Sequence, residues 1–261
     1  MLIKSGKVLD SGSSAAVRST VKSLQKALSI VGSIAASDRS LTVSEVALLV
    51  QVPRATAHRL IQTLVEAKYL QINPVDGRVS VGLAPISIAA RALDSHRLRI
   101  EALPQLQALA KQTGERSNLG CLFQHQVLYL AGIEKPGLPS IRTRFGQIVD
   151  AHACALGKAI VAFLPESDVL ALVKARPLRH ITPNTIVTLP MFLKDLAEIR
   201  RRGFAIDRGE NVEGSICISA PIFSPRNVPM AGIGITGRNL KSVLAEADAV
   251  MRSAECISHM L

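Results

Sequence analysis

The sequence is poor in aromatic residues, with no Trp, 6 Phe and 2 Tyr among 261 residues. Proteins that bind single-stranded nucleic acid use exposed aromatic rings on which successive bases stack. So few rings argue against a stacking surface of that kind.

Closely spaced cysteines are also missing. Cys121, Cys154, Cys217 and Cys256 lie far apart, and no two of them form a C-x-x-C pair. This spacing argues against a zinc cluster and against a dense disulfide framework. We therefore expect reduced thiols, no bound metal and no other cofactor.

Long apolar segments are absent as well. The N-terminal residues carry Lys4 and Lys7 but not the apolar stretch of a signal peptide. Apolar runs such as 159–164 are far shorter than the roughly 20 residues that span a bilayer. We expect a soluble, cytoplasmic protein that does not bind a membrane.

Basic residues, in contrast, are abundant. Lys and Arg total 31 against 20 Asp and Glu, a net charge of +11, and 48% of the chain is hydrophobic. The length favours two compact units. Residues 1–82 contain 10 basic and 5 acidic residues (10 − 5 = +5), and the remainder 21 and 15 (21 − 15 = +6). The charge density is thus higher at the amino end, which favours a polyanionic partner there.

The amino end begins with residues 1–18, which are rich in Ser and small residues and predict a flexible arm. A helix is expected over 20–36. Its apolar residues recur at spacings of three and four, which predicts a buried stripe on one face. That stripe consists of Leu24, Ala27, Leu28 and Val31.

Two more helices and a hairpin follow, and together they predict a winged helix-turn-helix over 19–82. Thr42 and Glu45 have the spacing of a capping box at the start of a short helix ending near residue 50. Pro53 begins a third helix that runs to about residue 68. Alternating residues on both sides of an Asp-Gly turn, 69–72 and 78–81, predict the hairpin.

The third helix has the composition of a recognition helix, which places short or forked side chains against base edges in the major groove. We expect base contacts from Arg54, Ala55, Thr56 and Arg59, and phosphate contacts from Ser44 and Arg78. Two alternatives remain open. The arginines of a small helical unit are often only solvated, and such units also mediate protein–protein contacts.

The rest of the chain predicts a linker helix within 83–98 and a second domain over 99–261, whose first helix ends near residue 112. Strands are expected at 117–123, 127–134, 140–145, 215–223 and 229–236. Helices are expected at 155–164, 168–175, 190–202 and 240–260. Consecutive strands with helices grouped between and after them favour an α+β domain with an antiparallel sheet.

Two patterns in this domain raise the question of catalysis or nucleotide binding. Residues 232–237 match G-x-G-x-x-G, but too little chain follows for the next strand of a dinucleotide fold, so the glycines more simply thin a strand. Asp207, Glu210, Cys217 and His152 include the groups of a thiol nucleophile with its base. A lone strand cysteine is more often a small buried residue. We expect no enzyme and keep a thiol-dependent enzyme using Cys217 as the alternative.

The whole chain resembles IclR-type bacterial transcriptional regulators. The matching segments lie in order at family spacing across 20–240. They are residues 23–28, 44–47, 53–60, 152–153, 157–159 and 199–205, followed by Asp207, Glu210, Gly214, Cys217 and residues 220–221.

The resemblance implies a winged helix-turn-helix, a linker helix and an α/β effector domain similar to GAF sensors. It also implies a homodimer or dimer of dimers on a palindromic operator in double-stranded DNA, controlled by a small organic acid. The implied effector-binding residues are Leu138, Ile141 and Val149 as an apolar wall, the backbone of Ala155 and Leu156, and Asp207, Cys217, Gly234 and Thr236.

Two departures from the family pattern concern the effector. Family members that bind the smallest keto acids tend to have a Gly-Ala pair where this chain has Ala155 and Leu156. They also tend to carry Ser at both 234 and 236, where this chain has Gly234 and Thr236. Glyoxylate or pyruvate should therefore not be assumed as the effector, and we expect a larger acid, aromatic or dicarboxylic.

Overall fold

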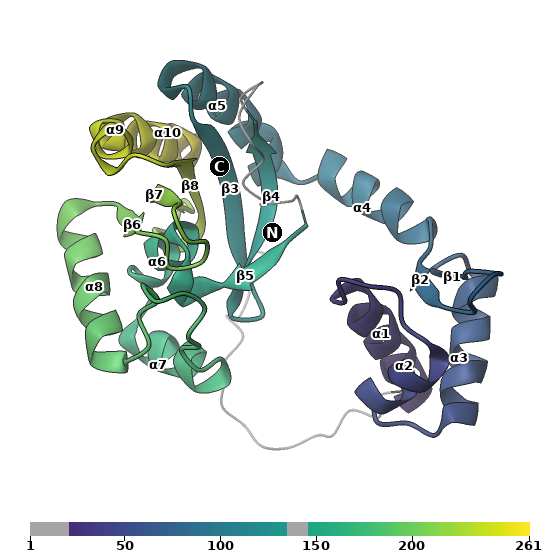
Figure 1. Ribbon diagram of the computed structural model, residues 1–261. Helices are drawn as coiled ribbons and strands as arrows, with labels where there is room; N and C mark the ends of the chain where they lie inside the picture. Colours follow the sequence, from purple (N-terminus) through teal and green to yellow (C-terminus); the bar gives the residue numbers. More distant parts are fainter. Residues whose placement is uncertain (1–20, 135–145) are drawn as a thin grey trace, which may run out of the picture. The chain divides into compact units, whose positions relative to one another are not determined.

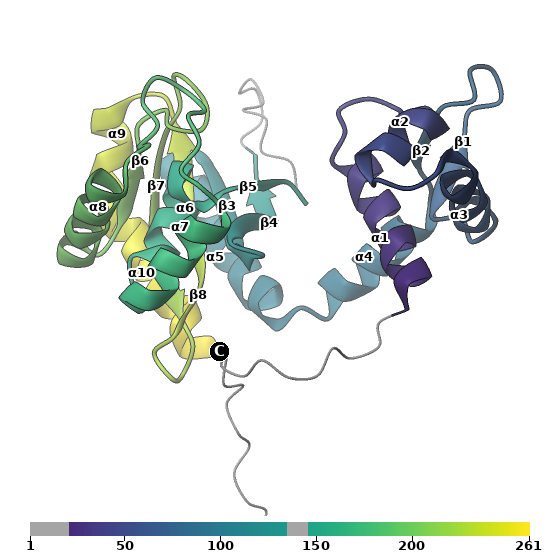
Figure 2. The ribbon, with the colours of Figure 1, turned by 90° about the horizontal axis from the view of Figure 1, so that it is seen from below.

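The computed structural model describes residues 21–134 and 146–261 (Figures 1 and 2). The predicted arm over 1–18 and the predicted strand over 140–145 lie outside these residues. The chain forms two compact units, residues 1–91 and 92–261.

The first unit has the element order that the sequence predicts. Thr42 accepts a hydrogen bond from the backbone of Glu45, and the Glu45 carboxylate accepts one from the backbone of Thr42, which confirms the capping box. A two-stranded antiparallel hairpin follows the third helix. The elements are α1 (Lys22–Ala35), α2 (Val43–Leu49), α3 (Arg54–Glu66), β1 (Leu70–Ile72) and β2 (Val79–Val81).

The buried face of α1 differs from the predicted stripe. Leu24 and Leu28 are 57% and 58% exposed, whereas Ile30 and Ile34 are buried in the core of the unit. Only the carboxy-terminal half of α1 reaches this core, so residues of the first two turns stay on the surface whatever their polarity. Val31 of the predicted stripe packs against this core, so periodicity identified the helix correctly but not how far along it the core extends.

Helix α4 (Ala84–Asp94) lies at the boundary between the two units, where the linker helix is expected, and has no buried residue. The second unit contains a six-stranded antiparallel sheet in the order β5-β4-β3-β8-β7-β6, and its mixture with helices confirms the α+β class. Its strands are β3 (Arg116–Phe123), β4 (Gln126–Ile133), β5 (Ile148–Asp150), β6 (Ala205–Asp207), β7 (Ile216–Phe223) and β8 (Pro229–Gly237).

Helices cover both faces of this sheet (Figures 1 and 2). One face packs on α5 (Arg97–Thr113), α9 (Leu240–Ala245) and α10 (Ala247–Met260) around an apolar cluster that includes Leu106 and Ile233. The other face carries α6 (Ala155–Val161), α7 (Glu166–Ala175) and α8 (Leu189–Arg202) over a second cluster that includes Leu156 and Phe192. A short 3-10 helix, η1 (Ala151–Ala153), precedes α6.

Three elements differ from the prediction. Strands β5 and β6 are only three residues long, too short to show an alternating pattern. The closing helix is divided at Glu246, where the backbone leaves helical geometry between α9 and α10.

Among the helices of the described residues, none is long and apolar enough to cross a membrane.

Candidate functional site

Helix α3 presents the predicted recognition residues on its outer face. Arg54, Ala55 and Arg59 are exposed, and Thr56 is half-buried at the edge of this face. Ala57 lies on the opposite face and is buried, as is Ile61 one turn later. The helix therefore has one side packed on its unit and one side free to contact a groove.

Glu45 joins the capping box of α2 to two arginines. Its Oε1 accepts a hydrogen bond from Arg39 Nη2 at 2.6 Å, and its Oε2 lies 3.8 Å from Arg78 Nη1. Arg78 also donates to the Ser40 carbonyl oxygen at 3.0 Å, so the strand after the hairpin turn is attached to the segment before α2. Ser44 is exposed in the first turn of α2. Two basic side chains thus gather beside this turn, one of which, Arg39, the sequence analysis did not select.

A groove between α1 and α3 adds another cation to the recognition helix. It has a volume of about 260 Å³ and brings Lys26 of α1 close to Arg59 and Thr56 of α3. Lys26 was not selected from the sequence because the helix periodicity alone does not show which side of α1 faces α3.

The second unit holds a small cavity between α6 and the sheet. Six of the predicted effector residues line it: Ala155, Leu156, Asp207, Cys217, Gly234 and Thr236. Its volume is about 10 Å³, room for about one water molecule. Any larger molecule must therefore displace the residues that line it.

The remaining predicted residues lie elsewhere. Val149 is buried in the apolar cluster of α6 and does not line the cavity. Leu138 and Ile141 lie outside the described residues. The cavity also contains residues that the sequence analysis missed: Asn118, Tyr129, Cys154, Ile218, Ser219 and Ile235. Asn118 and Leu119 are neighbours in a predicted strand, so their side chains lie on opposite faces of the sheet. The polar Asn118 within an otherwise apolar run was the signal that could have identified it.

Polar side chains within the cavity form a chain across three strands. Asn118 Nδ2 donates to Thr236 Oγ1 at 3.1 Å, and Thr236 Oγ1 lies 3.2 Å from Cys217 Sγ. Asp207 pairs with Cys217 across β6 and β7. Burial raises the pKa of Asp207 to about 7, although a hydrogen bond from the Glu210 backbone acts in the opposite direction. Burial thus favours the neutral form of the Asp207 carboxyl, which can donate a hydrogen bond.

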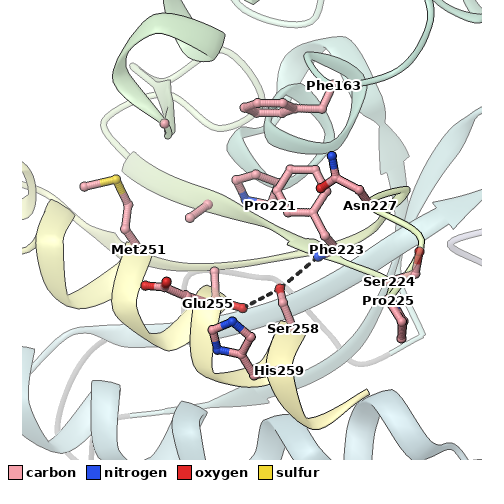
Figure 3. Close-up of a pocket in the computed structure, with 13 residues that line it drawn as sticks. Phe163, Pro221, Phe223, Ser224, Pro225, Asn227, Met251, Glu255, Ser258 and His259 are labelled. Carbon is pink, nitrogen blue, oxygen red and sulfur yellow. Dashed lines mark hydrogen bonds between the residues drawn. The ribbon is translucent and has the colours of Figure 1, made fainter.

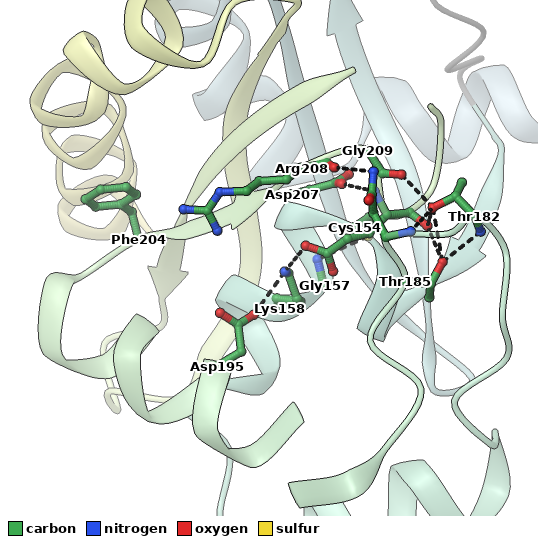
Figure 4. A network of polar contacts seen from close by, with 12 residues as sticks. Cys154, Gly157, Lys158, Thr182, Thr185, Asp195, Phe204, Asp207, Arg208 and Gly209 are labelled. Carbon is green, nitrogen blue, oxygen red and sulfur yellow. Dashed lines mark hydrogen bonds and ion pairs between the residues drawn. The ribbon is translucent and has the colours of Figure 1, made fainter. Parts of the chain in front are cut away.

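Next to the cavity, a buried lysine connects three elements (Figure 4). Lys158 of α6 is 1% exposed, and its Nζ lies 2.6 Å from Glu210 Oε1 and 2.9 Å from Asp195 Oδ2 of α8. The Thr182 and Thr185 hydroxyls donate to the carbonyl oxygens of Gly209 and Glu210, at 2.6 and 2.7 Å. The loop after Asp207 is therefore fixed by buried polar contacts, which orient the Asp207 carboxyl.

The thiol-nucleophile alternative finds no support in this geometry. Burial raises the pKa of Cys217 far above its usual range and that of Cys154 to about 12, so both thiols stay protonated. His152 directs Nε2 to the Arg179 carbonyl oxygen at 3.1 Å and packs edge-on against Phe192. The imidazole that would act as the base is thus held by another partner.

A larger cavity of about 500 Å³ lies beside β7, where β6 no longer pairs with it (Figure 3). Phe163 and Phe223 pack edge to face within it, and Ser258 Oγ accepts from the Phe223 backbone. It shares no lining residue with the small cavity and contains none of the predicted site residues. Within the described ranges, no three His, Cys, Asp or Glu side chains are arranged to hold a metal.

Comparisons with known proteins match both units. The model of the IclR helix-turn-helix domain matches residues 23–74, and that of the bacterial transcriptional regulator IclR C-terminal domain matches residues 90–259. The glycerol operon regulatory protein of Streptomyces coelicolor is 31% identical over 217 residues, 83% of this chain and 85% of that protein.

Solved structures agree. The Thermotoga maritima IclR structure aligns with a TM-score of 0.69 and 29% identity, over 93% of this chain and 99% of its own. A Microbacterium hydrocarbonoxydans IclR homologue in complex with 4-hydroxybenzoate shares the fold, with a TM-score of 0.77 and 22% identity, over 91% and 98% of the two chains. Together with a helix-turn-helix whose recognition face is exposed, these matches show that the chain belongs to the IclR family of bacterial transcriptional regulators.

Proposed function

We propose that binding of a small organic acid in the cavity beneath α6 controls the affinity of this regulator for its operator. The observation that carries the proposal is that one buried cavity gathers Asp207, Cys217 and Thr236 with the first turn of α6. A protonated Asp207 and the Thr236 hydroxyl can donate hydrogen bonds, and the Ala155 and Leu156 backbone offers further donors to a carboxylate. The 4-hydroxybenzoate complex of the Microbacterium relative supports the acid class.

On the DNA side, we infer that Arg54, Ala55, Thr56 and Arg59 contact base edges in the major groove. Ser44, Arg78 and the two added cations, Arg39 and Lys26, contact phosphates. The exposure of Arg54 and Arg59 on the free face of the helix supports this assignment, because arginine pairs with guanine O6 and N7 in the major groove. Phosphate contacts fix the position of the helix on the duplex without selecting sequence.

A second copy of the chain is part of this proposal. Val21, Leu24 and Leu28 of the α1 region are exposed, as are Leu83, Ile86 and Ile88 around α4. Exposed apolar side chains on both helices support an interaction site there. A two-fold homodimer, or a dimer of dimers, buries it and presents two recognition helices to the two halves of a palindromic operator.

The effector acts through the difference between its affinities for two arrangements of the dimer. A ligand that binds both arrangements equally changes nothing, however tightly it binds. The linker segment over 83–98 is the covalent connection through which such a change passes from the effector domain over 99–261 to the DNA-binding domain over 19–82.

The test combines ligand binding with DNA binding on the full chain. Organic acids are screened for a rise in melting temperature, since a ligand that binds only the folded protein stabilises it. Those that bind are then added to a gel-shift assay on the promoter beside the protein's own gene. We expect at least one acid to raise the melting temperature and change operator affinity, and Cys217→Ala to alter this response while retaining DNA binding. Operator binding that no stabilising acid changes would contradict the proposal.

A further inference from the structure

One amide in the small cavity is only partly satisfied. Asn118 is 4% exposed and donates through Nδ2 to Thr236 Oγ1. Its Oδ1 has no hydrogen-bond partner among the residues that the structure describes. A buried polar atom without a partner is destabilising and uncommon in native proteins, so it calls for an explanation.

The amide can be turned by 180° without removing this problem. Oδ1 would then accept a hydrogen bond from the Thr236 hydroxyl, and Nδ2 would occupy the place without a partner. In either orientation one end of the Asn118 amide stays unsatisfied. The missing partner must therefore donate a hydrogen bond to Oδ1 in the first orientation and accept one from Nδ2 in the turned orientation.

The unsatisfied end lies above a glycine, beside a buried cation. A Cβ added to Gly132 would lie 3.3 Å from Asn118 Oδ1 and 3.4 Å from Arg116 Nη2. Arg116 is 6% exposed, and its Nη1 pairs with Glu134 Oε1 at 2.9 Å. Glycine at position 132 thus keeps β4 from crowding the Asn118 amide and the Arg116 guanidinium, whose positive charge already has a counterion in Glu134.

We propose that Arg116, Asn118 and Gly132 form a subsite for a hydroxyl group of the effector, so that the effector is a hydroxylated organic acid. A hydroxyl accepts from the guanidinium and donates to Asn118 Oδ1 at the same time, and it also accepts from Nδ2 if the amide is turned. A second carboxylate has no proton for Oδ1, so it fits only the turned amide, and it would meet a guanidinium already paired with Glu134. The subsite adjoins the cavity because Asn118 belongs to both. This inference rests on the proposed function.

The experiment uses acids that differ by one hydroxyl, tested by calorimetry on the full chain. The pairs are 4-hydroxybenzoate with benzoate and 4-hydroxybutyrate with butyrate, and terephthalate supplies a second carboxylate in place of the aromatic hydroxyl. We expect the hydroxylated member of at least one pair to bind roughly tenfold or more tightly, as for a hydrogen bond to a charged group. We expect terephthalate to bind more weakly than 4-hydroxybenzoate.

Two variants locate the preference. Gly132→Ala crowds the proposed subsite with a methyl group 3.3 Å from Asn118 Oδ1 and keeps both polar side chains, and Asn118→Leu removes the amide at similar size. We expect both variants to lose the preference for the hydroxylated acid and to keep the native affinity for the acid without the hydroxyl. Gly32→Ala is the matched control, because no atom lies within 4 Å of the added Cβ.

The outcomes separate the two claims. Equal binding of both members of each pair, a preference that survives Gly132→Ala, or tighter binding of terephthalate overturns the hydroxyl subsite and leaves the effector proposal standing. If none of these acids binds and a wider acid screen also finds no ligand, both proposals fail together. If the wider screen finds only acids without a hydroxyl, the subsite alone fails.

Discussion

Asp207 of β6 and Cys217 of β7 are partners in the sheet register, and both line the small cavity beneath α6. The pairing places a carboxyl group in a cavity lined by two thiols, a tyrosine, apolar side chains and a few uncharged polar groups. Such surroundings favour the neutral form of the acid, so the protonation of Asp207 is coupled to folding.

Asp207 should therefore make the effector domain less stable as the pH rises. Its pKa is raised from 3.8 to about 7 by burial, so between these values the folded state binds more protons than the unfolded state. The contribution is fully present below about pH 4 and is lost as the pH rises through about 7, on the order of 4 kcal/mol in total. Urea denaturation at pH 5 and pH 8 measures the larger part of this loss, roughly 3 kcal/mol.

Asp207→Asn is the control for this assignment, because it keeps the size of the side chain and removes its titration. Glu210 and Lys158 also face Asp207 and remain in the variant. Part of the loss of stability between pH 5 and pH 8 should therefore disappear. An unchanged loss would assign the pH dependence to other groups.

Arg59→Ala should weaken operator binding by about 1–3 kcal/mol and relax sequence preference, as expected for removal of a base contact. Gel shifts on the operator and on an unrelated duplex of equal length give both quantities. Arg252→Ala, an exposed arginine of α10, is the control. If Arg59→Ala leaves affinity and preference at the values of the control, the outer face of α3 does not contact bases.

Lys26→Gln should behave differently, because it removes a phosphate contact. We expect weaker binding to every duplex by a similar factor, with a salt slope lower by about 0.9 for each subunit bound. Binding measured over a series of salt concentrations gives this slope. A loss confined to the operator would identify Lys26 as a base contact instead.

Lys158→Met should destabilise the effector domain by about 3–5 kcal/mol, because it leaves Glu210 without the cation that neutralises it. Asp195 loses the same partner. Lys158→Met combined with Glu210→Gln should recover part of this loss. Chemical denaturation measures the effect, and Lys174→Met on the exposed side of α7 should change stability little. If Lys158→Met is as stable as Lys174→Met, the buried contacts of Lys158 contribute nothing to stability.

Gly234→Ser, which would add a hydroxyl to the cavity, should destabilise this chain. A Cβ at this position collides with the Ile218 carbonyl oxygen and lies 2.9 Å from the Ser219 Cα. We expect a cost of about 1–3 kcal/mol from overpacking, seen as a lower melting temperature. A variant as stable as the native chain would mean that β7 moves aside easily.

Periodicity and turn residues were sufficient for much of the fold. The capping box, the hairpin and the long strands β3, β4, β7 and β8 carry local signals, and the structure confirms them. Which residues of α1 are exposed depends on where the core of the unit ends, and the local sequence gives no signal for this. β5 and β6 exist because longer strands offer them an edge to pair with.

The candidate site could likewise be predicted only in part from the sequence. Family motifs led to Asp207 and Cys217, which the sheet brings together. Asn118 and Tyr129 come from strands far away along the chain, and only the sheet order places them beside Thr236. Spacing along one strand cannot show such a neighbour.

The central pairing of the sheet also has a consequence for synthesis. β3 ends at Phe123, yet its partner β8 lies more than 100 residues later, with Arg116 opposite Thr236. On the ribosome, the amino-terminal unit can fold while the central strands of the second sheet are still incomplete. Because long-range pairing is slow, we expect the newly made chain to pass through a stage in which the DNA-binding unit is native and the second unit still needs protection from aggregation.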